Sequence, residues 1–116
     1  MVTSRKPHLD DLFGALSDPT RRAIVERLLA EGELAVSDIA EPFAISATAV
    51  SRHLQVLDRA GLIERRVDRQ WRRVRIRPDA FGEIESWLTA QRRYWTAALD
   101  RLEAMAATQT PKRRKS

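Results

Sequence analysis

Near the middle of the chain, one short segment carries side chains that could form hydrogen bonds with the edges of nucleotide bases. In residues 46–61, SATAVSRHLQVLDRAG, the apolar residues Val50, Leu54 and Leu57 recur at spacings of four and three, which predicts a helix with one buried stripe. The opposite face holds mixed donors and acceptors in place of the Glu/Lys pairs of an ordinary solvated helix, namely Thr48, Ser51, Arg52, Gln55 and Arg59. Because Arg pairs bidentately with guanine, Gln with adenine and hydroxyls with bases or phosphates, this face is suited to reading DNA.

The position of each side chain along this helix determines what it can reach. The N-terminal half of such a helix enters the major groove, so the residues best placed for DNA contact are Ser46, Ala47, Thr48, Ser51 and Arg52. Gln55 could reach a base or the backbone, His53 is expected to be packed or to touch a phosphate, and Arg59 is expected to meet a phosphate or a carboxylate. The alternative is a plain solvated polar face.

The positive charge of the chain is concentrated in two segments. The formal net charge is +5, but residues 62–77, LIERRVDRQWRRVRIR, contain seven Arg against only Glu64 and Asp68, and the C-terminal PKRRKS is also basic. The remainder of the chain is therefore acidic on balance. A neutral-to-acidic body with concentrated basic segments is typical of a protein that binds a polyanion on one face, with plain solubility as the alternative.

The Arg-rich segment follows a strand pattern. Apolar residues alternate with Arg in residues 73–77, and residues 62–67 can form the partner strand, with residues 68–70 at the turn. That turn has no Asn-Gly or Asp-Gly pair, so a longer and mobile loop is expected. Such a hairpin would form a wing beside the helix, and the turn residues Arg69 and Arg72 are the better candidates for phosphate or minor-groove contact. The full set of predicted wing contacts is Arg65, Arg66, Arg69, Gln70, Arg72 and Arg73.

Shorter helices must precede and position this segment. The first is predicted by the helical spacing of Leu9, Leu12, Phe13 and Leu16. Asp18-Pro19 is a strong start for a second helix, which stops at Gly32. A short third helix over residues 36–43 is limited by Pro42, which has no N–H to donate back one turn. Together with the helix of residues 46–61, it makes a helix-turn-helix pattern.

A long helix is predicted from Asp79 to about residue 107. Its heptad seam consists of Phe81, Ile84, Leu88, Gln91, Trp95, Ala98, Leu102 and Met105. A small domain cannot cover such a helix along its whole length. We therefore expect the second half to form a dimer interface, with an intramolecular core helix as the alternative.

Composition excludes several classes of function. The chain of 116 residues has no Cys, so disulfides and thiolate metal sites are excluded. It has two His and four Gly, and the Gly residues form no phosphate-binding loop. Ser51 and His53, two positions apart on a helix, point away from each other and cannot pair for catalysis. We therefore expect no enzyme, no cofactor and no metal site.

We expect one domain over residues 9–107, between a flexible arm of residues 1–8 and a disordered basic tail of residues 108–116. No stretch reads as a secretion signal or a membrane span, so we expect no membrane partner and a cytoplasmic location. The expected fold class is mainly α with a two-stranded β-hairpin wing. It is a winged helix-turn-helix with about five helices, in the order helix, helix, helix, helix, strand, strand, helix.

Three stretches, LSDPTRRAIVERLL, ELAVSDIAEPFAIS and ATAVSRHLQVLDRAGLI, are followed by the Arg-rich wing in an order that resembles the ArsR/SmtB family of bacterial winged helix-turn-helix repressors. The resemblance covers roughly residues 9–105. It implies a homodimer that binds a partly palindromic operator on double-stranded DNA in the nucleoid and blocks transcription. By position it implies DNA contacts from a wing of residues 65–73 and from Ser46, Thr48, Ser51, Arg52 and His53. The dimer would form through the first and last helices, with Leu9, Leu12, Phe13, Leu88, Gln91, Trp95, Ala98, Leu102 and Met105 at the interface.

The chain departs from the metal-sensing members of that family. Those members place Cys in the stretch that matches ELAVSDIA, where this chain has Ala35 and Ser37. Others bind metal through His on the last helix, but WLTAQRRYWTAALDRLEA contains no His. The chain therefore resembles the metal-independent branch, and any small-molecule or protein effector is undefined.

Other functions stay open at this point. The chain could be a non-specific architectural DNA-binding protein, or a winged-helix protein-interaction module in which only the basic tail touches nucleic acid. It could also sense a small molecule in a pocket at Trp87, Tyr94 and Trp95, although aromatic residues at helical spacing more often belong to a core.

Overall fold

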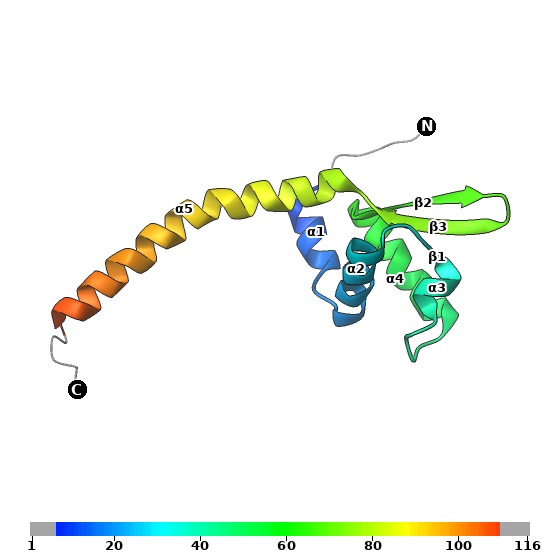
Figure 1. Ribbon diagram of the computed structural model, residues 1–116, viewed down its shortest axis with the longest axis horizontal. Coiled ribbons are helices and arrows are strands. Elements are labelled where there is room, and N and C mark those ends of the chain that lie inside the picture. Colours follow the sequence, from blue (N-terminus) through cyan, green and yellow to red (C-terminus); the bar gives the residue numbers. More distant parts are fainter. Residues whose placement is uncertain (1–6, 110–116) are drawn as a thin grey trace. The chain divides into compact units, whose positions relative to one another are not determined.

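In the computed structural model, residues 7–109 are described, and they form five helices and three strands (Figure 1). In chain order these are α1 (Leu9–Ala15), α2 (Pro19–Glu31), β1 (Leu34–Ala35), α3 (Val36–Ala40), α4 (Ala47–Ala60), β2 (Ile63–Asp68), β3 (Trp71–Ile76) and α5 (Pro78–Gln109). The chain divides into two compact units, residues 1–84 and residues 85–116. The order of elements in the first unit confirms the predicted winged helix-turn-helix.

The second helix begins and ends where the sequence predicts. The Asp18 carboxylate accepts a hydrogen bond from the Arg21 backbone N–H at 3.0 Å, which satisfies one of the free donors at the start of α2, and Pro19 occupies the first turn. Gly32 ends the helix with a φ of 83°, a conformation that a residue with a side chain rarely adopts. The third helix is shorter than the predicted 36–43, because it stops at Ala40, two residues before Pro42.

Both ends of α4 are capped by local hydrogen bonds. The Ser46 hydroxyl oxygen accepts from the Ala49 backbone N–H at 3.1 Å. At the other end Gly61 has a left-handed φ of 88°, and the Leu62 N–H bonds the Leu57 carbonyl at 3.0 Å, as in a Schellman motif. A Cβ at Gly61 would also meet Pro7 at 3.3 Å. Both termini of this helix are therefore fixed by its sequence, as predicted.

The N-terminal boundary differs from the expected arm of residues 1–8. Pro7 is buried beside Gly61, and His8 is the residue that precedes the first turn of α1. The chain is thus already packed against the first unit at residue 7. Residues 1–6 of the expected arm lie outside the described residues.

The sheet has three antiparallel strands in the order β1-β3-β2. The short strand β1, which pairs Leu34 with Val74, adds a third strand to the predicted two-stranded hairpin. The expected long loop at the hairpin tip is wrong: Asp68 pairs directly with Trp71, which leaves a turn of residues 69–70. Arg69 makes this tight turn with a φ of 62°, the left-handed conformation that Gly or Asn would normally supply.

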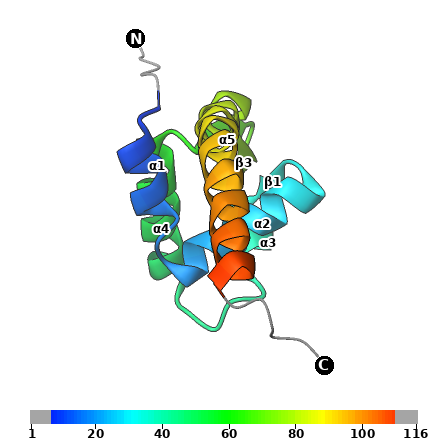
Figure 2. The ribbon, with the colours of Figure 1, turned by 90° about the vertical axis from the view of Figure 1, so that its left-hand side faces the viewer.

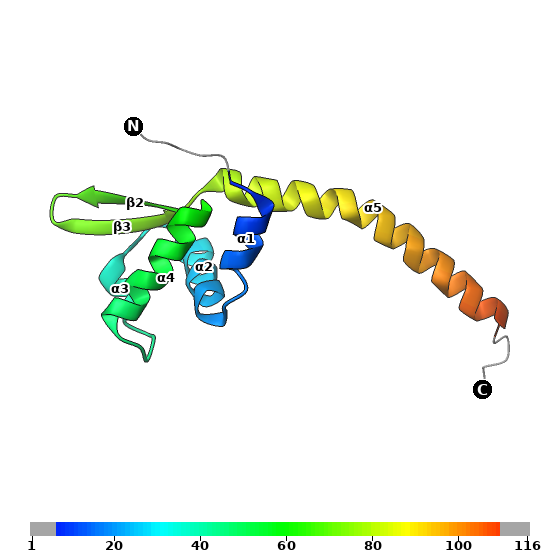
Figure 3. The ribbon, with the colours of Figure 1, turned by 180° about the vertical axis from the view of Figure 1, so that it is seen from behind.

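A single apolar core holds the first unit together. It includes the whole predicted stripe of α4, since Val50, Leu54 and Leu57 are all at most 1% exposed. The helix contacts α1, α2 and β2, and its place beside α1 is visible in Figures 2 and 3. The hairpin of β2 and β3 extends beyond these helices (Figures 1 and 3). The apolar stripe thus fixes α4 on the body of the unit.

Residues 85–109 of the second unit form one continuous stretch of α5. Large apolar side chains stay exposed along it, between 38% and 72%, namely Trp87, Leu88, Tyr94, Trp95, Leu99, Leu102 and Met105. The helix reaches Gln109, two residues into the expected tail of 108–116, and residues 110–116 lie outside the described part. Within residues 7–109, no helix is both long enough and apolar enough to cross a lipid bilayer.

Candidate nucleic-acid interface

The face of α4 opposite the core is open and polar. Thr48, Ser51, Arg52 and Gln55 are all exposed, and none of their side chains forms a hydrogen bond or an ion pair within residues 7–109. Arg59, one turn beyond Gln55, has no such partner either. A polar side chain that is left without an internal partner, on a helix that is fixed at both ends, is available to an external one. This is the arrangement that the sequence predicts for a helix that contacts DNA bases.

Two of the predicted contact residues at the start of α4 have different surroundings. Ala47 is exposed, so its methyl group is open to solvent. The oxygen of Ser46 is already used as the helix cap, although its O–H remains free to donate. Ser46 therefore has a structural role in addition to any contact with a ligand.

His53 does not lie on the open face. Its side chain is half-buried, with Nδ1 at 3.4 Å from Nη1 of Arg21 and at 3.9 Å from Oδ2 of Asp18. Both partners belong to the start of α2. Because a guanidinium can only donate, Nδ1 is the acceptor in the contact with Arg21. The structure thus places His53 between α4 and α2, in line with the packed alternative of the sequence analysis.

Arg21 connects three helices through one guanidinium group. Its Nε donates to the carbonyl of Ala15, the last residue of α1, at 2.7 Å, while Nη1 faces His53 of α4. The hydrogen bond from its backbone N–H lowers the pKa of the Asp18 carboxyl, against an opposing effect of desolvation. Sequence reasoning missed Arg21, because its partners lie in different helices.

Most Arg side chains of the hairpin are paired with carboxylates. The Arg65 guanidinium donates to Asp58 of α4 at 3.0 and 2.8 Å. Arg66 donates to both oxygens of Glu33 at 3.4 and 2.9 Å, and this bond raises the pKa of the Arg66 guanidinium. Arg73 lies 3.8 Å from the same carboxylate. Two further pairs join Arg75 to Glu64 and Arg77 to Asp79.

The hairpin tip is different from the rest of the hairpin. Arg69 and Arg72 are exposed and have no ion pair within the part of the chain that is described. Gln70, between them, is exposed as well. Trp71 at the tip is 49% exposed, so only about half of its surface is buried. Positive charge without an internal partner is therefore concentrated at the end of the wing.

A shallow cavity joins α4 to the hairpin. It has a volume of about 300 Å³, and Ser51 and Leu54 of α4 line it together with apolar Val36 and Val67. The other lining residues are Arg65, Arg66, Arg72 and Arg73. The structure thus brings Ser51 and four of the predicted wing residues to one place.

The residues predicted for a dimer interface fall into two groups. In the first unit, Leu12 is completely buried in the core, Leu9 is half-buried, and Phe13 is 40% exposed. Leu12 therefore packs within its own chain and offers no surface to a partner. In the second unit, Gln91 and Ala98 are half-buried, and the exposed members are Leu88, Trp95, Leu102 and Met105.

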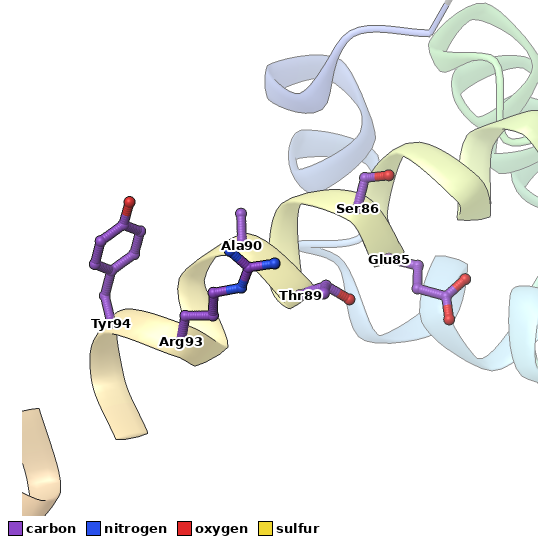
Figure 4. Close-up of a pocket in the computed structure, with 6 residues that line it drawn as sticks. All are labelled: Glu85, Ser86, Thr89, Ala90, Arg93 and Tyr94. Atoms are coloured by element: carbon purple, nitrogen blue, oxygen red, sulfur yellow. The ribbon is translucent and has the colours of Figure 1, made fainter. Parts of the chain in front are cut away.

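The hypothesis of a pocket at Trp87, Tyr94 and Trp95 receives limited support. A hollow of about 410 Å³ lies along residues 85–94, and Figure 4 shows that its lining side chains all project from one helix. Tyr94 lines it, whereas Trp87 and Trp95 are not among the lining residues. Within residues 7–109, no three His, Asp or Glu side chains are grouped so that they could hold a metal ion.

Comparison with known proteins also identifies a helix-turn-helix in this chain. A family described as a helix-turn-helix domain matches residues 16–66. The HTH-type transcriptional regulator Rv2034 of Mycobacterium tuberculosis is 42% identical over 99 residues, which cover 85% of this chain and 87% of that protein. The transcriptional repressor SdpR of Bacillus subtilis is 46% identical over 55 residues, covering 47% of this chain and 60% of the repressor.

A solved structure extends the likeness to the fold. The crystal structure of the ArsR family transcriptional regulator RHA00566 matches with a TM-score of 0.70 at 34% identity, over 76% of this chain and 96% of that one. The chain therefore belongs to the ArsR family of helix-turn-helix transcriptional regulators.

Proposed function

We propose that this regulator is a homodimeric repressor that reads a partly palindromic operator with α4 in the major groove. The observation that carries the proposal is the open face of α4, where Thr48, Ser51, Arg52 and Gln55 have no internal partner. Arg and Gln at such positions can pair bidentately with guanine and adenine, and hydroxyls can bond bases or phosphates. Ser46 and Ala47, at the start of the helix, complete the proposed contact set.

The wing would contact the DNA beside the major groove. Arg69, Gln70 and Arg72 at the tip are exposed, and the two Arg carry charge that no carboxylate of the described chain neutralises. Arg inserted into a narrow minor groove or placed on phosphates is a common way for such a hairpin to bind. Arg65, Arg66 and Arg73, the other Arg in the predicted set of wing contacts, are each paired with a carboxylate of the described chain, so the proposed contacts of the wing are those of its tip.

The dimer would use the apolar side of α5. Exposed Leu88, Trp95, Leu102 and Met105 follow the heptad seam of the second unit, and so many exposed large apolar side chains on one helix mark an interaction surface. Phe13 of α1, which is 40% exposed in the first unit, belongs to the dimer contacts that the resemblance to the family implies. Two-fold symmetry would then place two copies of α4 on successive turns of one face of DNA.

The proposed regulator acts in the cytoplasm, on the nucleoid, and its effector is not a metal ion. Ala35 stands where metal-sensing members of the family place Cys, and Ser37 is a poor ligand for the transition metals that such sites bind. The proposal contains no catalytic step and no cofactor.

Selection of bound DNA from a random pool tests this proposal directly. We expect the recovered sites to contain two symmetric half-sites with centres roughly 10 base pairs apart, or a multiple of that spacing. The double variant Thr48→Ala with Arg52→Ala should lose the sequence preference, whereas Arg92→Ala, which removes the same charge from α5, should keep it. Recovered sites without symmetry would replace the repressor with an architectural DNA-binding protein. An unchanged preference in the double variant would remove α4 from the contact surface.

A further inference from the structure

Two carboxylates outside the hairpin hold three of its Arg side chains. Glu33, just before β1, faces Arg66 and Arg73, and Asp58 of α4 faces Arg65. The three Arg also line the cavity that contains Ser51, so they lie next to the open face of α4. Arg72 lines the same cavity but has no ion pair within residues 7–109, so the three Arg differ from it in being held by acids from other elements.

We propose that Glu33 and Asp58 determine specificity by keeping these three Arg side chains from DNA phosphates. The inference rests on the proposed function and deepens it. It assigns to two acidic residues a role in how strongly the protein discriminates between its operator and other DNA. Neither residue would touch DNA itself.

The physical reason lies in the two parts of protein–DNA affinity. Each cation that neutralises a phosphate strengthens binding to every sequence alike and steepens its dependence on salt. Specificity is a difference between two affinities, so cations on phosphates add no discrimination of their own. A carboxylate that occupies both donors of a guanidinium fork competes with phosphate for that fork. Glu33 does this with Arg66, at 3.4 and 2.9 Å, and Asp58 binds two nitrogen atoms of Arg65.

The distribution of pairs along the hairpin fits this role. The unpaired Arg69 and Arg72 lie at or next to the tip, while Arg65, Arg66 and Arg73 in the middle of the hairpin are each paired with a carboxylate. If every Arg served only to attract DNA, acids beside three of them would oppose that purpose. Arg75 is paired as well, with Glu64 of the hairpin itself. A wing with two free cations and four paired ones contributes a limited, sequence-independent affinity.

The restraint is of moderate strength, because the pairs are partly open to solvent. The Arg66 side chain is 54% exposed and Glu33 is 24% exposed, while Arg65 and Asp58 are 43% and 38% exposed. Ion pairs with this exposure are weak and are screened by salt. Phosphate can therefore compete with the carboxylates, and their removal should change affinity by a measurable but modest factor.

Binding of the full chain to its selected operator and to a scrambled duplex, measured by fluorescence anisotropy between 50 and 200 mM salt, tests the proposal. The variants are Glu33→Gln and Asp58→Asn. Glu26→Gln is the matched control, because exposed Glu26 in α2 has no ion pair within residues 7–109 and its loss changes the net charge equally.

Relative to Glu26→Gln, we expect Glu33→Gln to bind the scrambled duplex about threefold to tenfold more tightly. Its plot of log affinity against log salt should be steeper by about one to two units, since two Arg are released, and that of Asp58→Asn by about one. Operator affinity should rise by a smaller factor, so the ratio between operator and scrambled DNA falls. Adding Arg66→Gln and Arg73→Gln to Glu33→Gln should return the salt dependence to the control value.

Three outcomes would overturn the inference. The salt dependence of Glu33→Gln could equal that of Glu26→Gln, or the ratio between operator and scrambled DNA could stay unchanged. Affinity for both duplexes could also fall in a variant whose circular dichroism shows a folded chain, which would make Glu33 a support for the wing. A wild-type protein that bound neither duplex would be a separate result, because it would overturn the proposed function itself.

Discussion

The guanidinium of Arg21 in α2 donates to Nδ1 of His53 in α4 at 3.4 Å. The same group also donates to the Ala15 carbonyl at the end of α1. Arg21 therefore links the buried side of α4 to the connection between α1 and α2. The imidazole lies on the side of α4 that faces α2, away from the open polar face. His53 therefore positions the helix and is not expected to read bases.

His53→Ala should weaken operator binding by about threefold to tenfold, because one hydrogen bond that orients α4 is lost. Base preferences at every operator position should stay as in the wild type. Competition with operators that carry single base changes measures this, and a loss of preference at one position would show that His53 contacts a base after all.

Arg52 and Arg59 allow a comparison within one helix. Arg52→Ala should relax the preference at one base pair of each half-site by about 1–3 kcal/mol, because it lies in the half of α4 that enters the groove. Arg59→Ala should weaken binding to all sequences alike. Both side chains are exposed and unpaired among the described residues, so either substitution leaves the fold intact. If the two variants showed the same base preferences at every operator position, the assigned orientation of α4 would be contradicted.

The tip of the wing should contribute phosphate contacts only. Arg69→Ala or Arg72→Ala should each reduce the slope of log affinity against log salt by about one, with the base preferences retained. Titration of a fluorescent duplex at several salt concentrations measures the slope. Arg101→Ala, which removes an exposed charge from α5, is the control and should leave the slope nearly unchanged.

The apolar side of α5 should control assembly. Leu102 is 57% exposed, and Leu102→Glu would bury a carboxylate in the proposed seam, so we expect the dimer to dissociate. Sedimentation equilibrium measures the mass, with Arg101→Glu as a neighbouring change of charge outside the seam. If both variants stay dimeric, the interface does not use this part of the helix.

The cap of α2 should make stability depend on pH. The hydrogen bond from the Arg21 backbone N–H lowers the pKa of the Asp18 carboxyl below its ordinary value of 3.8. The stabilisation is therefore complete above that pH and is lost as the pH falls through the lower pKa of the folded state. Wild type should be more stable than Asp18→Asn at neutral pH, and denaturant unfolding should show this difference shrinking below pH 3.8. Asp100→Asn is the control. If its difference in stability from wild type had the same size and pH dependence, the effect could not be assigned to the Asp18 cap.

Local patterns in the sequence were enough to predict the five helices and the ends of α2 and α4. Asp18, Gly32, Ser46 and Gly61 mark helix ends through short-range hydrogen bonds and backbone conformations, which depend on neighbouring residues alone. The open face of α4 was predictable for the same reason, since helical spacing separates it from the buried stripe.

Long-range pairs could not be predicted in this way. Strand β1 is only two residues long, too short to show an alternating pattern, and it forms because β3 offers it a free edge. Arg66 finds its acid partner Glu33 across 33 positions of the sequence, and His53 finds Arg21 across 32. Which Arg side chains are free and which are held therefore depends on tertiary structure.

The turn at Arg69 has a consequence for protein engineering. With a φ of 62°, this position would suit Gly or Asn better than any residue with a long side chain. Arg69→Gly should therefore make the isolated chain more resistant to unfolding while it weakens its hold on DNA. A screen that selects for thermal resistance alone would favour that change and would steadily remove the cation at the wing tip.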